Sequence, residues 1–250
     1  MRNSLTLKAY AKINLHLDVT GRLDNGYHTI SSVMQQISLH DVITVTREAA
    51  APNEQTIHIT CTEPTIPTDS KNIAHKCASA FFAHFGISSY RIHIHIDKRI
   101  PHAAGLAGGS TDGAAVLKLL PDLFEIQADT ELLCSIGGKL GADIPFCIAG
   151  GTCLAEGIGE KLTPVKRQFR CPILVAIDGE GVSTPEAYGR IDAMYGDAVG
   201  TASEERLEFL SQTQIPKKLY NIFESVILPT HDEARRIKEA MLEQGAVSAL

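Results

Sequence analysis

Apolar and polar residues alternate over several stretches of the chain, as they do in β-strands that bury one face. Residues 5–20 carry this pattern twice and predict a pair of strands, followed by the turn-rich run Gly21–Gly26. Similar patterns predict further strands over residues 32–39, 42–45, 55–61, 91–96, 150–154 and 173–177.

Other stretches repeat their apolar residues with a helical period. Residues 72–85 form the clearest amphipathic helix. Further helices are expected over 111–120 (ended by Pro121), 131–140, 186–194 and 232–244 (capped by Gly245), with a loop over 196–205 and the start of a strand over 246–250. Strands come first and helices interleave without a regular βαβ repeat, which predicts the α+β class.

A change in composition near Ala155 predicts two domains, residues 1–154 and 155–250. The net charge of -6 gives no sign of a nucleic-acid surface, so an anionic substrate would have to meet local cations. No apolar run reaches membrane-spanning length and no signal core opens the chain, which predicts a cytoplasmic protein with no membrane partner. The six cysteines contain no Cys-x-x-Cys pair and are expected to be free thiols.

The glycine-rich run Pro101–Ala115 leads directly into a predicted helix. The N–H groups at a helix start have no intrahelical partner, and glycines allow an anion to approach them closely. Ser110 and Thr111 add hydroxyls at that point. The run therefore predicts a polyphosphate site, and a purely structural turn is the alternative. The run lacks the Gly-Lys-Ser/Thr of a Walker loop and the acidic residue of a dinucleotide fold.

Lys12 and Asp143 lie in otherwise apolar surroundings. Lys12 is in the strand-like Ala11–Leu15, on the same face as Asn14, and Asp143 is in Gly141–Phe146. A lysine beside an aspartate would keep the carboxylate ionised for proton transfer. The alternatives are a surface lysine lying along its strand and an aspartate that caps a helix or turn.

Tyr27 and His28 follow the tight turn Asn25-Gly26. They could stack on and hydrogen-bond a base, or Tyr27 could pack on a sheet edge. The pair His93 and His95 could bind zinc, but the alternation of its strand favours a polar sheet face.

These motifs together resemble those of the GHMP kinase superfamily. The matching stretches are 11–15, 24–28, 98–101, 101–110, 141–146 and 157–162. Ala107 departs from the signature, which has glycine there; a positive φ at this alanine would strain the loop by about 1 kcal/mol. Within the superfamily, the Asn-Gly-Tyr-His run resembles that of members acting on a cytidine-diphosphate-linked methylerythritol, rather than on a sugar or mevalonate.

The resemblance implies a two-domain fold with the active site in the cleft between the domains. It implies ATP-dependent phosphorylation of the substrate's C2 hydroxyl, with ATP and Mg²⁺ as cofactors and no protein metal ligand assigned. Asp143 would be the general base and Lys12 its partner. The implied substrate contacts are Asn14, Tyr27, His28 and Tyr188, and the implied ATP contacts are Pro101, Gly105, Leu106, Ala107, Gly108, Gly109, Ser110 and Thr111, with Asn72 and Lys98 near the adenine and ribose. The family carries a further glycine-rich motif after a segment like 245–250, which is absent from these 250 residues. Either the chain is truncated before this motif or the protein is natively short, and in the second case the alternative function is a nucleotide-binding sensor or inactive remnant.

Overall fold

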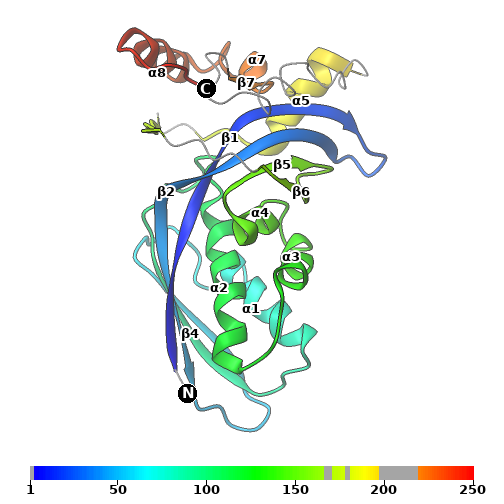
Figure 1. Cartoon of the computed structure of the whole chain (residues 1–250), viewed down its shortest axis with the longest axis vertical. Coiled ribbons are helices and arrows are strands. Elements are labelled where there is room, and N and C mark those ends of the chain that lie inside the picture. Colours follow the sequence, from blue (N-terminus) through cyan, green and yellow to red (C-terminus); the bar gives the residue numbers. More distant parts are fainter. Residues whose placement is uncertain (1–2, 166–170, 178–180, 197–218) are drawn as a thin grey trace. The chain divides into compact units, whose positions relative to one another are not determined.

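The computed structural model describes residues 3–165, 171–177, 181–196 and 219–250 (Figure 1). The chain forms two compact units, each discontinuous in sequence. The first contains Met1–Ile13 and Gln36–Gly150, and the second contains Asn14–Gln35 and Gly151–Leu250. The long strands β1 (Ser4–Arg22) and β2 (His28–Glu48) contribute residues to both units. The continuous domains 1–154 and 155–250, and an active site between domains, stay predictions.

The first unit combines a sheet with four helices. Strand β4 (Tyr90–Asp97) pairs in parallel with β3 (Gln55–Cys61) and antiparallel with β2, where Val42 lies opposite Asp97. The strand order is β3-β4-β2-β1. Figure 1 shows the helices on one side of these strands. They are α1 (Ile73–His84), α2 (Gly108–Phe124), α3 (Thr130–Gly138) and α4 (Ile144–Ala149).

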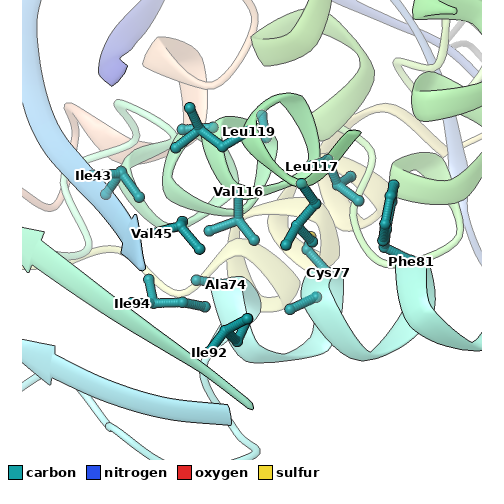
Figure 2. Close-up of a cluster of buried hydrophobic side chains, with 14 of the residues drawn as sticks. Ile43, Val45, Ala74, Cys77, Phe81, Ile92, Ile94, Val116, Leu117 and Leu119 are labelled. Carbon is teal, nitrogen blue, oxygen red and sulfur yellow. The ribbon is translucent and has the colours of Figure 1, made fainter. Parts of the chain in front are cut away.

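Alternation along β4 builds the core of this unit. Ile92, Ile94 and Ile96 are buried, whereas His93 and His95 face away from the core. The isoleucines pack with apolar residues of β2, α1 and α2 (Figure 2), among them Ile43, Val45, Ala74, Cys77, Phe81, Val116 and Leu117. Each such side chain contributes roughly 1.5–3 kcal/mol on full burial. This core supports the start of α2, the helix that follows the glycine-rich run.

The second unit is built on the other parts of the two long strands. Residues Ser32–Gln35 of β2 pair antiparallel with β5 (Thr152–Glu156), which pairs in turn with β6 (Lys161–Pro164). The short strand β7 (Tyr220–Asn221) runs parallel to β1 at His16 and Leu17. The helices described in this unit are α5 (Thr184–Tyr195), α7 (Glu224–Ile227) and α8 (Asp232–Glu243).

The two long strands correct the predicted strand boundaries. Residues 5–20 lie in one continuous strand, and the predicted strands 32–39 and 42–45 are parts of β2. The prediction placed a break at His40-Asp41, between two separate strands. Asp41 is instead fully buried inside the strand, because its carboxylate has partners that the local sequence does not reveal.

Three further boundaries were wrong. Helix α2 begins at Gly108 and continues through Pro121 to Phe124. The proline removes only one hydrogen bond near the helix end, and the buried Leu119, Leu120 and Leu123 hold this end of the helix in the core. Residues 173–177 and 246–250 form no strand, because an apolar run needs a neighbouring strand to pair with. The short elements α4, β6 and α7 were not predicted, and residues 197–205 of the predicted loop lie outside the described residues.

The expected free thiols are confirmed for all six cysteines. None of the helices within the described ranges is long and apolar enough to cross a membrane.

Candidate active site

The glycine-rich run forms a loop with an unusual backbone and no side-chain cap. Ala103, Gly105 and Ala107 have φ angles of 57°, 70° and 58°, all left-handed. Ala107 occupies the N-cap position of α2, where its methyl group cannot accept a hydrogen bond. The first N–H groups of α2 therefore have no side-chain cap, and together with the helix dipole they favour an anion. The φ angle of Ala107 is positive, so the alanine that replaces the signature glycine adopts the strained backbone conformation.

The glycines near this loop serve different purposes. A Cβ on Gly108 would lie 2.8 Å from Lys98 Nζ, and one on Gly113 would lie 2.7 Å from Cys77 Sγ. Both glycines are required by the packing of the protein. A Cβ on Gly109 would have nothing nearer than Ile73 Cγ1 at 3.9 Å. The described protein atoms therefore do not require glycine at position 109.

Two hydrogen bonds tie the glycine loop to β1. The backbone N–H of Lys12 donates to the Leu106 carbonyl at 3.1 Å. The Thr111 hydroxyl donates to the Tyr10 carbonyl at 2.8 Å. The loop is thereby tied to β1 at Lys12, and the start of α2 is tied to the same strand at Tyr10.

Lys12 and Asp143 meet in the first unit, which is the pairing that the family resemblance implies. The Lys12 Nζ lies 3.7 Å from Asp143 Oδ2, and the side chains are 9% and 33% exposed. Lys12 is thus not a surface lysine. Asp143 lies in a turn at the N-cap position of α4, as the alternative expected, but its side chain makes no capping hydrogen bond. Its carboxylate is partly open to solvent and paired with a cation.

Cys147, one helical turn after Asp143, was predicted from its apolar surroundings before Gly150-Gly151 to be a buried thiol, and the structure shows it half-buried. Burial, followed by the charge of Asp143, raises the pKa of the Cys147 thiol to about 12, against the opposing effects of Lys12 and Thr111. The thiol therefore stays protonated at neutral pH and does not act as a nucleophile.

Asn72 and Lys98 have side chains that are occupied within the protein. Asn72 caps α1 by accepting from Ala74 N at 2.8 Å, and its amide donates to the Pro67 carbonyl at 2.7 Å. The Lys98 side chain is 5% exposed, and its Nζ lies between Asp41 and Asp112. Their assignment to the adenine and ribose of ATP stays a prediction, and these side-chain interactions do not support it.

The second unit contains the other predicted substrate residues. The Asn14 amide donates to the Ser32 hydroxyl at 2.6 Å, which donates to the His16 carbonyl at 2.7 Å. Tyr27 is 61% exposed and is not packed on the sheet. His28 is buried, and its ring stacks on Tyr188 with centroids 4.6 Å apart and an interplanar angle of 16°.

Asp192 completes this group and was missed from the sequence. Its Oδ1 lies 2.7 Å from His28 Nε2, and its Oδ2 lies 3.3 Å from Arg22 Nη1. Tyr188 and Asp192 are four residues apart on α5, so they share one helix face. That spacing was the signal available once Tyr188 had been selected. Asp192 orients the imidazole that Tyr188 covers.

The histidine pair on β4 belongs to a polar sheet face. Thr60 Oγ1 lies 2.8 Å from both His93 Nε2 and His95 Nδ1. Within the described ranges, no group of three or more His, Cys, Asp or Glu side chains could hold a metal ion.

Comparisons with known proteins agree with these motifs. The model of the GHMP kinases N terminal domain matches residues 72–151. A Clostridium botulinum (strain Alaska E43 / Type E3) protein named 4-diphosphocytidyl-2-C-methyl-D-erythritol kinase is 41% identical over 98% of this chain and 86% of its own length. A protein of the same name from Clostridium kluyveri (strain NBRC 12016) is 39% identical, with the same coverage of both chains.

Solved structures extend the comparison to the fold. A crystal structure of 4-(cytidine 5'-diphospho)-2C-methyl-D-erythritol kinase is 28% identical and covers 96% of this chain and 84% of its own, with a TM-score of 0.74. The mevalonate pyrophosphate decarboxylase from Streptococcus pyogenes shares the fold, with a TM-score of 0.69 at 15% identity over 98% of this chain and 84% of its own. The predicted α+β GHMP-kinase fold is confirmed. The chain belongs to the 4-diphosphocytidyl-2-C-methyl-D-erythritol kinase family of GHMP kinases.

Proposed function

We propose that this chain transfers the γ-phosphoryl group of ATP to the C2 hydroxyl of 4-(cytidine 5'-diphospho)-2-C-methyl-D-erythritol. Kinases of this family use ATP as the phosphate donor, and relatives at about 40% identity carry the substrate in their name. The observation that carries the proposal is the Lys12–Asp143 pair beside the uncapped start of α2. It brings a base, a cation and an anion-binding helix end together in one unit.

Asp143 is suited to accept the proton of the attacking hydroxyl. Its carboxylate makes no capping hydrogen bond and is one third exposed, so a substrate can reach it. Lys12 would stabilise the negative charge that develops on the attacking oxygen. The substrate oxygen forms a bond to the γ-phosphorus, the bond to the β–γ bridging oxygen breaks, ADP leaves, and the proton goes to Asp143.

The start of α2 would hold the phosphates of ATP. The N–H groups of Gly108, Gly109 and Ser110 have no intrahelical acceptor and lie at the positive end of the helix dipole. The neighbouring protein atoms would leave room for a methyl group at Gly109. The close approach of a phosphate explains the glycine there.

The oxygen donors near this helix end also fit Mg²⁺, which the family's chemistry implies. Mg²⁺ in proteins is commonly held by one or two carboxylates together with substrate phosphates, so a cage of protein ligands is not needed. Asp143 supplies a carboxylate and Ser110 a hydroxyl, and a Cβ on Gly141 would lie 4.0 Å from Ser110 Oγ. When bound, the ion would neutralise charge that develops on the phosphates.

The aromatic group of the second unit would recognise the cytosine. The exposed Tyr27 ring offers a stacking face, and His28 offers a hydrogen-bonding edge that Asp192 and Tyr188 hold in place. Asn14 lies in the same unit and would contact the substrate through its amide.

A product assay tests the proposal. The purified chain is mixed with ATP, magnesium and the cytidine-linked substrate, and mass spectrometry follows the gain of one phosphoryl group. Inhibition of this reaction by CMP is expected, and its absence would favour a kinase for a sugar or mevalonate. ATP binding without formation of ADP would contradict the proposal and support a nucleotide-binding sensor.

A further inference from the structure

A second group of ionisable side chains is buried beneath the glycine loop. It consists of Asp41, Lys98 and Asp112, whose side chains are 0%, 5% and 4% exposed. They come from three segments of the first unit: β2, the end of β4, and the first turns of α2. Buried charges are costly unless they are paired and hydrogen-bonded. The Lys12–Asp143 chemistry does not use this cluster.

Asp41 holds the segment that enters the loop. Its Oδ1 accepts the backbone N–H groups of Arg99 at 2.5 Å and Ile100 at 2.7 Å. Its Oδ2 accepts from Lys98 Nζ at 2.5 Å. Three donors thus converge on one carboxylate, which is the environment of an anion.

Lys98 connects this segment to the helix that leaves the loop. Its Nζ donates to Asp112 Oδ2 at 3.0 Å, and Asp112 directly follows the anchoring residue Thr111. The same ammonium would lie 2.8 Å from a Cβ on Gly108, the first residue of α2. The cluster therefore joins both ends of the loop, 98–100 and 108–112.

The charges of the cluster balance only if one carboxyl is protonated, because two carboxylates face one ammonium. Asp112 Oδ1 is buried and accepts no hydrogen bond from the described residues. A proton there would turn an unsatisfied acceptor into a donor. Burial is the main cause that raises the pKa of Asp112 well above its usual value. The negative charge of Asp41 acts in the same direction, and Lys98 opposes the shift.

We propose that Asp41, Lys98 and Asp112 are positioning residues for ATP, with Asp41 as the anion, Lys98 as the cation and Asp112 as a neutral acid. The cluster sets the distance between the two ends of the glycine loop and so keeps the N–H groups of α2 directed at the phosphates. This inference rests on the proposed function, since it assigns the glycine loop to ATP.

The proposal predicts that one chemical change has different effects at the two aspartates. Asp112→Asn resembles the neutral acid and keeps an oxygen for Lys98. Asp41→Asn removes the anion and leaves a buried ammonium without its counter-ion. Because displaced N–H groups of α2 would lose charge-assisted hydrogen bonds to the phosphates, we expect Asp41→Asn to weaken ATP binding on the order of 10²-fold. Asp112→Asn should weaken it by about fivefold, the effect of one neutral hydrogen bond.

Calorimetric titration with ATP measures these constants, and steady-state assays give KM for ATP and for the cytidine-linked substrate. Asp41→Asn should raise KM for ATP much more than KM for the second substrate. Val45→Ala, a core truncation in the same strand, is the matched control for lost stability and should leave the ATP constants near those of the parent. If Val45→Ala affects ATP as strongly as Asp41→Asn, or if Asp112→Asn equals Asp41→Asn, the positioning role is wrong.

A double variant keeps the test decisive if Asp41→Asn does not fold. Asp41→Asn with Lys98→Met removes both charges, so no buried ion is left unpaired. It should still weaken ATP binding on the order of 10²-fold, since the loop loses its link; parent-like binding would overturn the inference. Failure of the unaltered chain to bind ATP would instead contradict the proposed function.

Discussion

Two lysine–aspartate pairs lie beside the same glycine loop and differ in their surroundings. Lys12 and Asp143 are 3.7 Å apart, and the aspartate is one third exposed. Lys98 and Asp41 are 2.5 Å apart, and the aspartate is completely buried. A carboxylate that takes a proton must be reachable and must keep a lone pair for its substrate. A carboxylate that fixes backbone is most effective when donors surround it, as they do Asp41.

Exchanging each lysine for methionine should separate the two roles most clearly. Lys12→Met should lower kcat by about 10²-fold or more, because the base loses its cation, and should leave the ATP dissociation constant within a small factor. Lys98→Met should mainly weaken ATP binding. Steady-state kinetics with calorimetry on both variants measures the split. If both variants lose kcat and ATP affinity to the same extent, the distinction between the two pairs fails.

Two glycines of α2 extend the comparison from charges to backbone. Gly109→Ala should weaken ATP binding by about 10- to 100-fold, because charge-assisted hydrogen bonds to the phosphates are lost. Its thermal stability should not fall, since the new methyl group would make an ordinary van der Waals contact with Ile73 Cγ1, at 3.9 Å. Gly113→Ala should instead destabilise the fold by about 1–2 kcal/mol through overpacking against Cys77 and Ile73. Calorimetric binding and thermal unfolding distinguish the two, and parent-like ATP affinity in Gly109→Ala would remove the case for phosphate approach there.

A third carboxylate, Asp192, tests whether substrate recognition lies in the second unit. Asp192→Asn should raise KM for the cytidine-linked substrate about tenfold, because His28 loses a charge-assisted hydrogen bond. KM for ATP should change little. Glu186→Gln, on the same helix and paired with Arg190, is a matched control outside the His28 group. Equal effects of Asp192→Asn on both substrates would argue against a role specific to cytosine.

The smallest expected effect concerns Ala107. Ala107→Gly removes the strain of a left-handed alanine at φ 58°, which is worth roughly 1–2 kcal/mol. The greater freedom of glycine in the unfolded chain offsets about 0.4–1 kcal/mol of this stabilisation. The variant should therefore be stabilised by about 0.5–1 kcal/mol in chemical denaturation. A destabilised variant would show that the methyl group supports the loop by packing.

The sequence was sufficient for the site residues that lie in contiguous motifs. The glycine loop, Lys12 and Asp143 each stand out against apolar neighbours, and the structure brings Lys12 and Asp143 together. Asp41 and Asp192 could not be found in this way, because their partners are distant along the chain. The pairing of Asp41 with Lys98, for example, spans 57 residues. The same limit explains the false break in β2, since the local pattern reveals none of the distant donors that surround Asp41. Asp112 lies in the glycine-rich run and was interpreted as part of a helix cap, which is wrong because Ala107 is the N-cap residue.

The most direct test of the account is Asp143→Asn, examined by single-turnover phosphoryl transfer and by ATP titration. The substitution keeps the shape of the side chain and removes the base. We expect transfer to fall by about 10²-fold or more while the ATP dissociation constant stays within a small factor of the parent value. Transfer at the parent rate would contradict the assignment of Asp143 as the general base and the distinction between the two lysine–aspartate pairs.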